Sequence, residues 1–121
     1  MKNPQELFYN LAYNLALVAY KLDEVPVGAV IIKDDTYELV STGYNQMRSN
    51  KSSLDHAEML ALRSAMSRLN QERLIGCSMI TTLEPCPMCL SAIYWSHIDN
   101  IFYANTRIDA ANIDFDDSFI Y

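Results

Sequence analysis

The sequence predicts an α/β fold in which helices pack against one sheet, and two observations support this. Apolar residues recur at three- and four-residue steps in some segments and form short β-branched runs in others. These segments follow one another as helix, strand, strand, helix, strand, helix, strand, an order that favours an α/β or mixed sandwich. Half of the 121 residues are hydrophobic and only three are glycine, so we expect residues 1–121 to form one domain around one core.

The N-terminal half is predicted to hold one helix and two strands. Residues 5–21 carry apolar side chains at helical spacing. The continuous β-branched run over 27–32 is typical of a buried strand, and the polar residues 33–35 after it predict a turn. Residues 38–42 fit a second strand. The polar segment 45–53 predicts a loop.

The second half is predicted to alternate helices with strands. Helical spacing returns over residues 56–69. Residues 76–83 fit a third strand, which must end before Pro85 because proline cannot donate to a central ladder. A third helix is expected over 87–96, since proline suits the first position of a helix. Residues 98–104 fit a fourth strand.

Charge and hydropathy limit the class of function. The net charge of -6 argues against a non-specific polyanion binder, because phosphate neutralisation needs clustered basic residues, and it favours a small-molecule substrate. The longest apolar run, over 15–20, is too short and too polar to span a bilayer. The first residues lack the apolar stretch of a signal peptide. We therefore expect a cytoplasmic protein with no membrane partner and with reduced cysteines.

Two short motifs contain the candidate metal ligands, and both lie at the start of a predicted helix. His56 opens the first motif, and Cys86 and Cys89 belong to the second. One imidazole and two thiolates suit Zn²⁺ better than Mg²⁺ or Ca²⁺, which prefer oxygen. Cys77 and His97 lie at the far ends of their elements, so no fourth ligand is placed to close the site. Three protein ligands leave room for water, which is the catalytic arrangement of zinc.

Glu58 is the candidate general acid/base. Residues two apart on a regular helix do not face the same point, so we place His56 at or just before the first turn, with Asp55 or Ser53 as the cap. From there Glu58 can reach a water at the metal and move its proton. His-x-Glu followed by Pro-Cys-x-x-Cys is the signature of zinc deaminases.

Plainer interpretations compete with this one. Cys86-x-x-Cys89 alone would fit a redox pair, and the cluster could be a structural zinc site; the presence of His56 and Glu58 and the missing fourth ligand disfavour both. Cys77 is expected to be a buried apolar residue and His97 a cap or surface residue. Of the adjacent rings of Tyr94 and Trp95, we expect one to face the core and the other an interface.

Beyond these motifs, the chain resembles the cytidine-deaminase-like superfamily, which implies a three-layer α/β/α sandwich with a central mixed sheet. Two branches of the superfamily are involved. One is the bacterial tRNA adenosine deaminases, and the other is the bacterial guanine deaminases. The first branch is resembled by residues 24–30, 56–63 and 82–86, and the second by residues 92–95, 109–111 and 115–121.

The resemblance implies roles for two further residues. In both branches the position of Asn45 would hydrogen-bond the substrate, and in guanine deaminases the position of Asp117 would contact the purine and help to shuttle protons. A homodimer is also implied. The chain departs from guanine deaminases at Val25–Ala29, where they usually carry Gly-Pro-Phe-Gly-Ala. Guanine deaminases also continue past the position of Tyr121, so a domain without the family's C-terminal segment is expected.

We therefore expect zinc-dependent hydrolytic deamination of a small-molecule purine base, guanine to xanthine with release of ammonia. The alternative within the class is deamination of adenosine to inosine in tRNA, where the base must be flipped into the pocket. An alternative from another class is an inactive, zinc-stabilised interaction domain, which the short C-terminus leaves open.

Overall fold

The computed structural model of the protein describes residues 4–105 as eight elements. The expected role of Asp117 and the guanine-deaminase-like residues 109–121 lie outside the described residues. In chain order the elements are α1 (Pro4–Lys21), β1 (Gly28–Lys33), β2 (Leu39–Tyr44), α2 (Met47–Asn50), α3 (Ala57–Leu69), β3 (Cys77–Leu83), α4 (Pro87–Trp95) and β4 (Asn100–Asn105).

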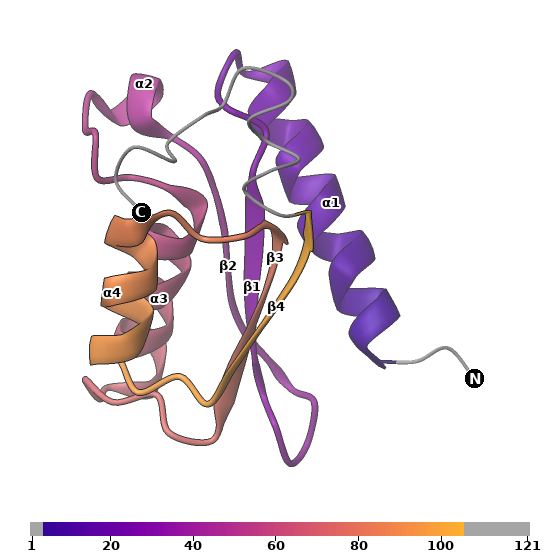
Figure 1. Ribbon diagram of the computed structural model, residues 1–121, viewed down its shortest axis with the longest axis vertical. Helices are drawn as coiled ribbons and strands as arrows, with labels where there is room; N and C mark the ends of the chain where they lie inside the picture. The colour runs from indigo at the N-terminus through magenta and orange to yellow at the C-terminus, as the bar shows by residue number, and fades with distance from the viewer. Residues whose placement is uncertain (1–3, 106–121) are drawn as a thin grey trace.

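The four strands form one mixed sheet in the order β2-β1-β3-β4. Strand β1 pairs antiparallel with both β2 and β3, whereas β3 and β4 run parallel. Helix α1 covers one face of the sheet, and α3 and α4 lie side by side on the other (Figure 1). The expected three-layer α/β/α sandwich with a central mixed sheet is confirmed.

The central strand β1 explains why its sequence is apolar at consecutive positions. Ala29 and Ile31 pack into the cluster that includes the residues of α3, while Val30 and Ile32 pack with the residues of α1. All four side chains are buried. A strand covered by helices on both faces needs apolar residues at every position instead of at alternate ones. Hydrophobic burial on both sides thus holds the sheet in the middle of the sandwich.

Two expectations about local structure were wrong. The polar segment 45–53 contains a short helix, α2, where a loop was expected. The rings of Tyr94 and Trp95 meet edge to face with centroids 5.8 Å apart, and both side chains are 75% exposed, so neither faces the core. Cys77 is buried and His97 is exposed, as expected. None of the helices among residues 4–105 is long and apolar enough to cross a membrane.

Candidate metal centre

The three candidate ligands come from the starts of two helices at the same end of the sheet (Figure 1). His56 is the N-cap residue of α3 and Cys86 is the N-cap residue of α4, both with extended backbone (ψ 157° and 170°). Cys89 follows in the first turn of α4 and is fully buried. Pro87 occupies the first turn as well, where its missing N–H removes no helical hydrogen bond. Local helix-start geometry therefore places all three side chains.

The spacing of the ligand atoms fits a zinc ion. Nδ1 of His56 lies 3.6 Å from Sγ of Cys86 and 3.5 Å from Sγ of Cys89, and all three atoms lie within 4.8 Å of one another. Zinc bonds of about 2.3 Å to sulfur and about 2.05 Å to nitrogen at tetrahedral angles would separate S from N by about 3.6 Å. The donor set, one imidazole and two thiols, is also one that zinc prefers. His56, Cys86 and Cys89 are thus positioned to hold a metal.

The two thiols differ in acidity because they share a hydrogen bond. Donation from Cys89, helped by His56, lowers the pKa of Cys86 from 9.0 to about 3 despite partial burial. Hydrogen bonding to Cys86 and burial raise the pKa of Cys89 above its ordinary value. The thiolate is the form that binds metal, so the lowered pKa of Cys86 suits it to the role of a ligand.

Glu58 lies against this cluster from the first turn of α3. Its side chain is only 4% exposed, and it shares a hydrogen bond with Cys89. Burial raises its pKa above the ordinary value of 4.5, and the hydrogen bond opposes that shift. Because the extended backbone of His56 precedes the helix, two residues only two positions apart reach the same cluster, as the sequence predicted.

The predicted cap of α3 was wrong. The N-cap position is filled by His56 itself, whose side chain makes no capping hydrogen bond. Asp55 is buried just before it, where its carboxylate accepts a hydrogen bond of 2.9 Å from Nδ2 of Asn50. Asp55 therefore closes the loop that leads to His56 instead of capping the helix.

Asn45 lies at the other end of that connection, directly after β2, and is 3% exposed. Its backbone N–H donates to the carbonyl of Val27 over 3.2 Å, and its Oδ1 accepts from the N–H of Met47 over 3.0 Å. The segment between β2 and α3 thus begins with the expected substrate contact and ends with the expected metal ligand.

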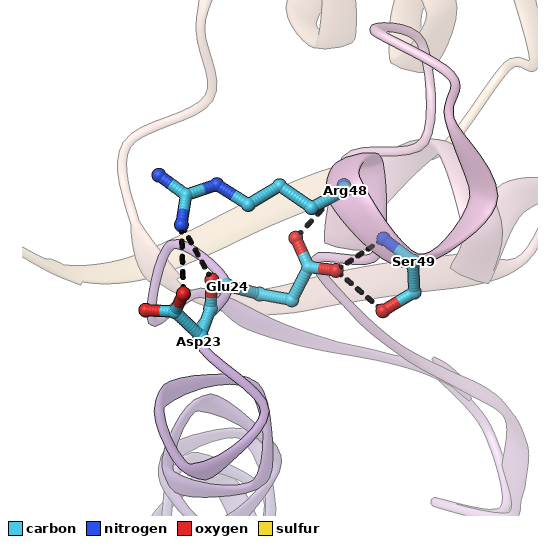
Figure 2. Close-up of polar contacts among 4 residues, drawn as sticks. All are labelled: Asp23, Glu24, Arg48 and Ser49. Atoms are coloured by element: carbon cyan, nitrogen blue, oxygen red, sulfur yellow. Dashed lines mark hydrogen bonds and ion pairs between the residues drawn. The ribbon is translucent and has the colours of Figure 1, made fainter.

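The sequence did not predict the role of one residue that contacts this segment from elsewhere in the chain. Glu24, in the link between α1 and β1, is 6% exposed and binds the start of α2 (Figure 2). Hydrogen bonds from the side chain of Ser49, and from the backbone of Arg48 and Ser49, lower its pKa below the ordinary 4.5, although burial opposes this. A glutamate in a loop is normally a solvated charge. The partners of Glu24 lie 24 and 25 positions away along the chain, so no local pattern predicts its burial.

Comparison with known proteins agrees with this geometry. The family described as the zinc-binding region of cytidine and deoxycytidylate deaminases matches residues 2–105. The chain is 45% identical over 96 residues to a guanine deaminase of Bacillus subtilis, a match that covers 79% of this chain and 60% of the relative. It is 40% identical over 100 residues to a tRNA-specific adenosine deaminase of Aquifex aeolicus, which covers 83% and 65%. The chain therefore spans less than two thirds of the length of either relative.

A solved structure shares the fold. The X-ray structure of guanine deaminase from Bacillus subtilis superposes with a TM-score of 0.91 at 40% identity, covering 100% of this chain and 75% of that one. The likeness includes the mixed sheet and its helices, and it extends over both helix starts that carry the candidate ligands.

Proposed function

Since the chain belongs to the family defined by the zinc-binding region of cytidine and deoxycytidylate deaminases, we propose that it hydrolyses guanine to xanthine and ammonia. The observation that carries this proposal is the cluster of His56, Cys86 and Cys89 with the buried carboxyl group of Glu58 against it. A structural zinc site would need no acid/base residue beside the metal. We further propose a cytoplasmic homodimer as the working form.

In this mechanism His56, Cys86 and Cys89 hold zinc, which when bound supplies Lewis-acid activation of water at neutral pH. Glu58 accepts a proton as the water oxygen bonds to the carbon bearing the amino group, and it delivers that proton to the adjacent ring nitrogen. Glu58 then moves the remaining hydroxyl proton to the amino group. The C–N bond breaks and ammonia leaves, so that guanine and water give xanthine and ammonia.

Two further residues would orient the base. Asn45 is placed at the end of β2, and we propose that its amide hydrogen-bonds the purine. Asp117 is proposed, from the resemblance to guanine deaminases, to contact the purine and assist proton transfer. Buried amide groups with fixed partners favour a substrate that presents matching donors and acceptors.

Guanine is favoured over adenosine in tRNA by two observations. The guanine deaminase relative is 45% identical and the tRNA-specific relative 40%, and the chain carries a net charge of -6. A tRNA substrate would need a basic surface to neutralise phosphates. Adenosine in tRNA is the second candidate function, because the tRNA-specific relative aligns over a slightly larger share of this chain.

An ammonia-release assay on guanine, adenine, cytosine, their nucleosides and tRNA tests the proposal. We expect ammonia from guanine, together with zinc at about one ion per chain. Release from tRNA alone would replace guanine by the second candidate. Zinc binding without turnover of any of these substrates would mean that the protein is a zinc-stabilised interaction domain.

A further inference from the structure

Helix α2 lies along the chain between Asn45 and His56, and it is too short to be stable alone. It has four residues, Met47–Asn50, and its N-cap residue Gln46 makes no side-chain capping bond. A single helical turn fixes many backbone dihedrals for few hydrogen bonds, so other parts of the chain must hold it. Its position matters because Asn45 immediately precedes it and His56 follows it.

The start of α2 is held by two side chains that divide its N–H groups between them. Oε1 of Glu24 accepts from the N–H of Arg48 over 3.0 Å, and Oε2 accepts from the N–H and Oγ of Ser49 over 2.7 and 2.6 Å (Figure 2). The N–H of Met47, the first residue of the helix, donates to Oδ1 of Asn45 over 3.0 Å. A buried carboxylate that accepts three hydrogen bonds is a strong and directional anchor.

The link between α1 and β1 therefore holds the Asn45–Ser49 segment at both ends. The carbonyl of Val27 accepts from the backbone N–H of Asn45, and the side chain of Glu24 holds Arg48 and Ser49. We propose that Glu24 is a positioning residue that fixes the amide of Asn45 for substrate binding, an inference that rests on the proposed function. Without Glu24, the N–H of Met47 that orients this amide loses its fixed place.

The His56 end of the connection has its own supports. The hydroxyl of Ser41, on β2, donates to the carbonyl of Ala61 in α3 over 2.8 Å, so that the sheet itself holds this helix. The carbonyl of His56 accepts the N–H of Leu60 as the first bond of α3. The effect of Glu24 should therefore fall on substrate binding and not on the metal ligands.

The experiment compares Glu24→Gln and Glu24→Ala with Asp23→Asn as the matched control. Asp23→Asn removes the same charge from the neighbouring position, where the side chain is 95% exposed and pairs with the guanidinium of Arg48 at 3.1 Å. Asparagine also tolerates the positive φ of 61° found there. Glu24→Gln keeps one acceptor oxygen and serves if the alanine variant folds poorly.

The readouts are KM and kcat on guanine, zinc content, and amide hydrogen exchange over residues 45–50. We expect Glu24→Ala to raise KM about tenfold or more with kcat within about threefold of the wild type, the pattern of lost substrate binding. The KM of Glu24→Gln should lie between those of the wild type and of Glu24→Ala. Zinc content should not change, hydrogen exchange should rise at Arg48 and Ser49, and Asp23→Asn should match the wild type.

A wild-type KM in both Glu24 variants would overturn the positioning role, and so would loss of zinc or of kcat at unchanged KM. If wild-type protein released no ammonia from guanine but deaminated another substrate, the proposed function would be wrong, and the same KM comparison on that substrate would decide the role of Glu24. Absence of any turnover in the zinc-loaded wild type would overturn both.

Discussion

The backbone of Gly43 on β2 lies directly against the backbone of Ala57, the first residue of α3. A Cβ at position 43 would meet the carbonyl of Ala57 and would lie 2.9 Å from the backbone nitrogen of Ala61. Glycine at this position lets the start of α3 approach the sheet. His56 and Glu58 flank Ala57, so the missing side chain on β2 sets where both of them lie.

We expect Gly43→Ala to lower the free energy of unfolding by about 3 kcal/mol, since the added methyl group meets backbone that cannot turn away. It should also reduce the zinc bound by the folded protein, because α3 must shift. Gly28→Ala is the matched control: its Cβ would meet the carbonyl of Ala12 in α1, on the other face of the sheet. Denaturant unfolding and metal analysis should show similar destabilisation but zinc loss only for Gly43→Ala. Equal zinc loss in both would contradict this account.

Replacement of single cysteines should separate the ligands from the buried thiol. Cys86→Ser and Cys89→Ser should each abolish stoichiometric zinc binding, because the weaker oxygen donor leaves too few ligands. Cys77→Ser should keep zinc while it lowers stability by about 1–3 kcal/mol, the usual cost of a buried unpartnered hydroxyl. Cys77 is 2% exposed at the far end of β3. Metal analysis of the purified variants gives the result, and zinc retained by Cys89→Ser would remove that residue from the ligand set.

Removal of the metal should destabilise the wild-type protein more than any of the variants that do not bind it. A ligand that binds only the folded state stabilises that state by RT ln(1 + [L]/Kd), where [L] is the concentration of free ligand. Chelator treatment should therefore lower the melting temperature of the wild type and of Cys77→Ser, and leave Cys86→Ser almost unchanged. An identical shift in all three proteins would mean that the chelator acts elsewhere.

Glu58→Gln should leave zinc content unchanged and lower kcat by about 10²- to 10⁴-fold, the usual contribution of a general acid/base. The amide has nearly the shape of the carboxyl group but cannot accept the proton of water. Glu38→Gln is the control, since the side chain of Glu38 is 55% exposed and its ion pairs with Lys33 and Arg68 are long, at 3.8 and 3.9 Å. Steady-state kinetics on guanine would decide, and undiminished kcat in Glu58→Gln would exclude the proposed proton transfer.

The lowered pKa of Glu24 predicts a pH-dependent stability difference. A carboxyl group whose folded-state pKa lies below its unfolded value stabilises the fold fully above that unfolded value. The contribution is lost as the pH falls from about the ordinary value of 4.5 through the lower folded pKa. The difference in free energy of unfolding between the wild type and Glu24→Gln should therefore be constant near neutral pH and shrink below about pH 4.5. Urea titrations from pH 7 to pH 3 measure it, and a difference that grew on acidification would refute the assignment.

The elements that sequence patterns predicted best are those whose stability depends on their own residues. The apolar run of β1 indicates a strand that is buried on both faces. The proline at the start of α4 indicates a first helical turn, where the backbone N–H has no partner within the helix. Helix α2 could not be found in this way, because its N–H groups are satisfied by Glu24 from another part of the chain. The prediction for Tyr94 and Trp95 was also wrong. Their adjacent positions on a helix do not determine which elements their side chains contact, and both side chains are exposed.

The candidate site was predictable where residue type and spacing carry the chemistry. His56, Cys86 and Cys89 follow from ligand preference and from two helix starts, and the structure places their ligand atoms together. The cap of α3 was misassigned because a short polar residue was expected at the position that the histidine itself fills. Asn45 and Asp117 came only from the family resemblance, and Glu24 gives no local signal of burial.

The N-cap positions of α3 and α4 are held by His56 and Cys86, neither of which makes the side-chain bond that usually closes a helix start. Transfer of the three side chains alone to another scaffold would therefore not rebuild the site. The scaffold would also need two helix starts held at the same relative position. Such a host protein would need two neighbouring helices that start at the same end of a sheet, with a glycine on the strand against which the first helix packs.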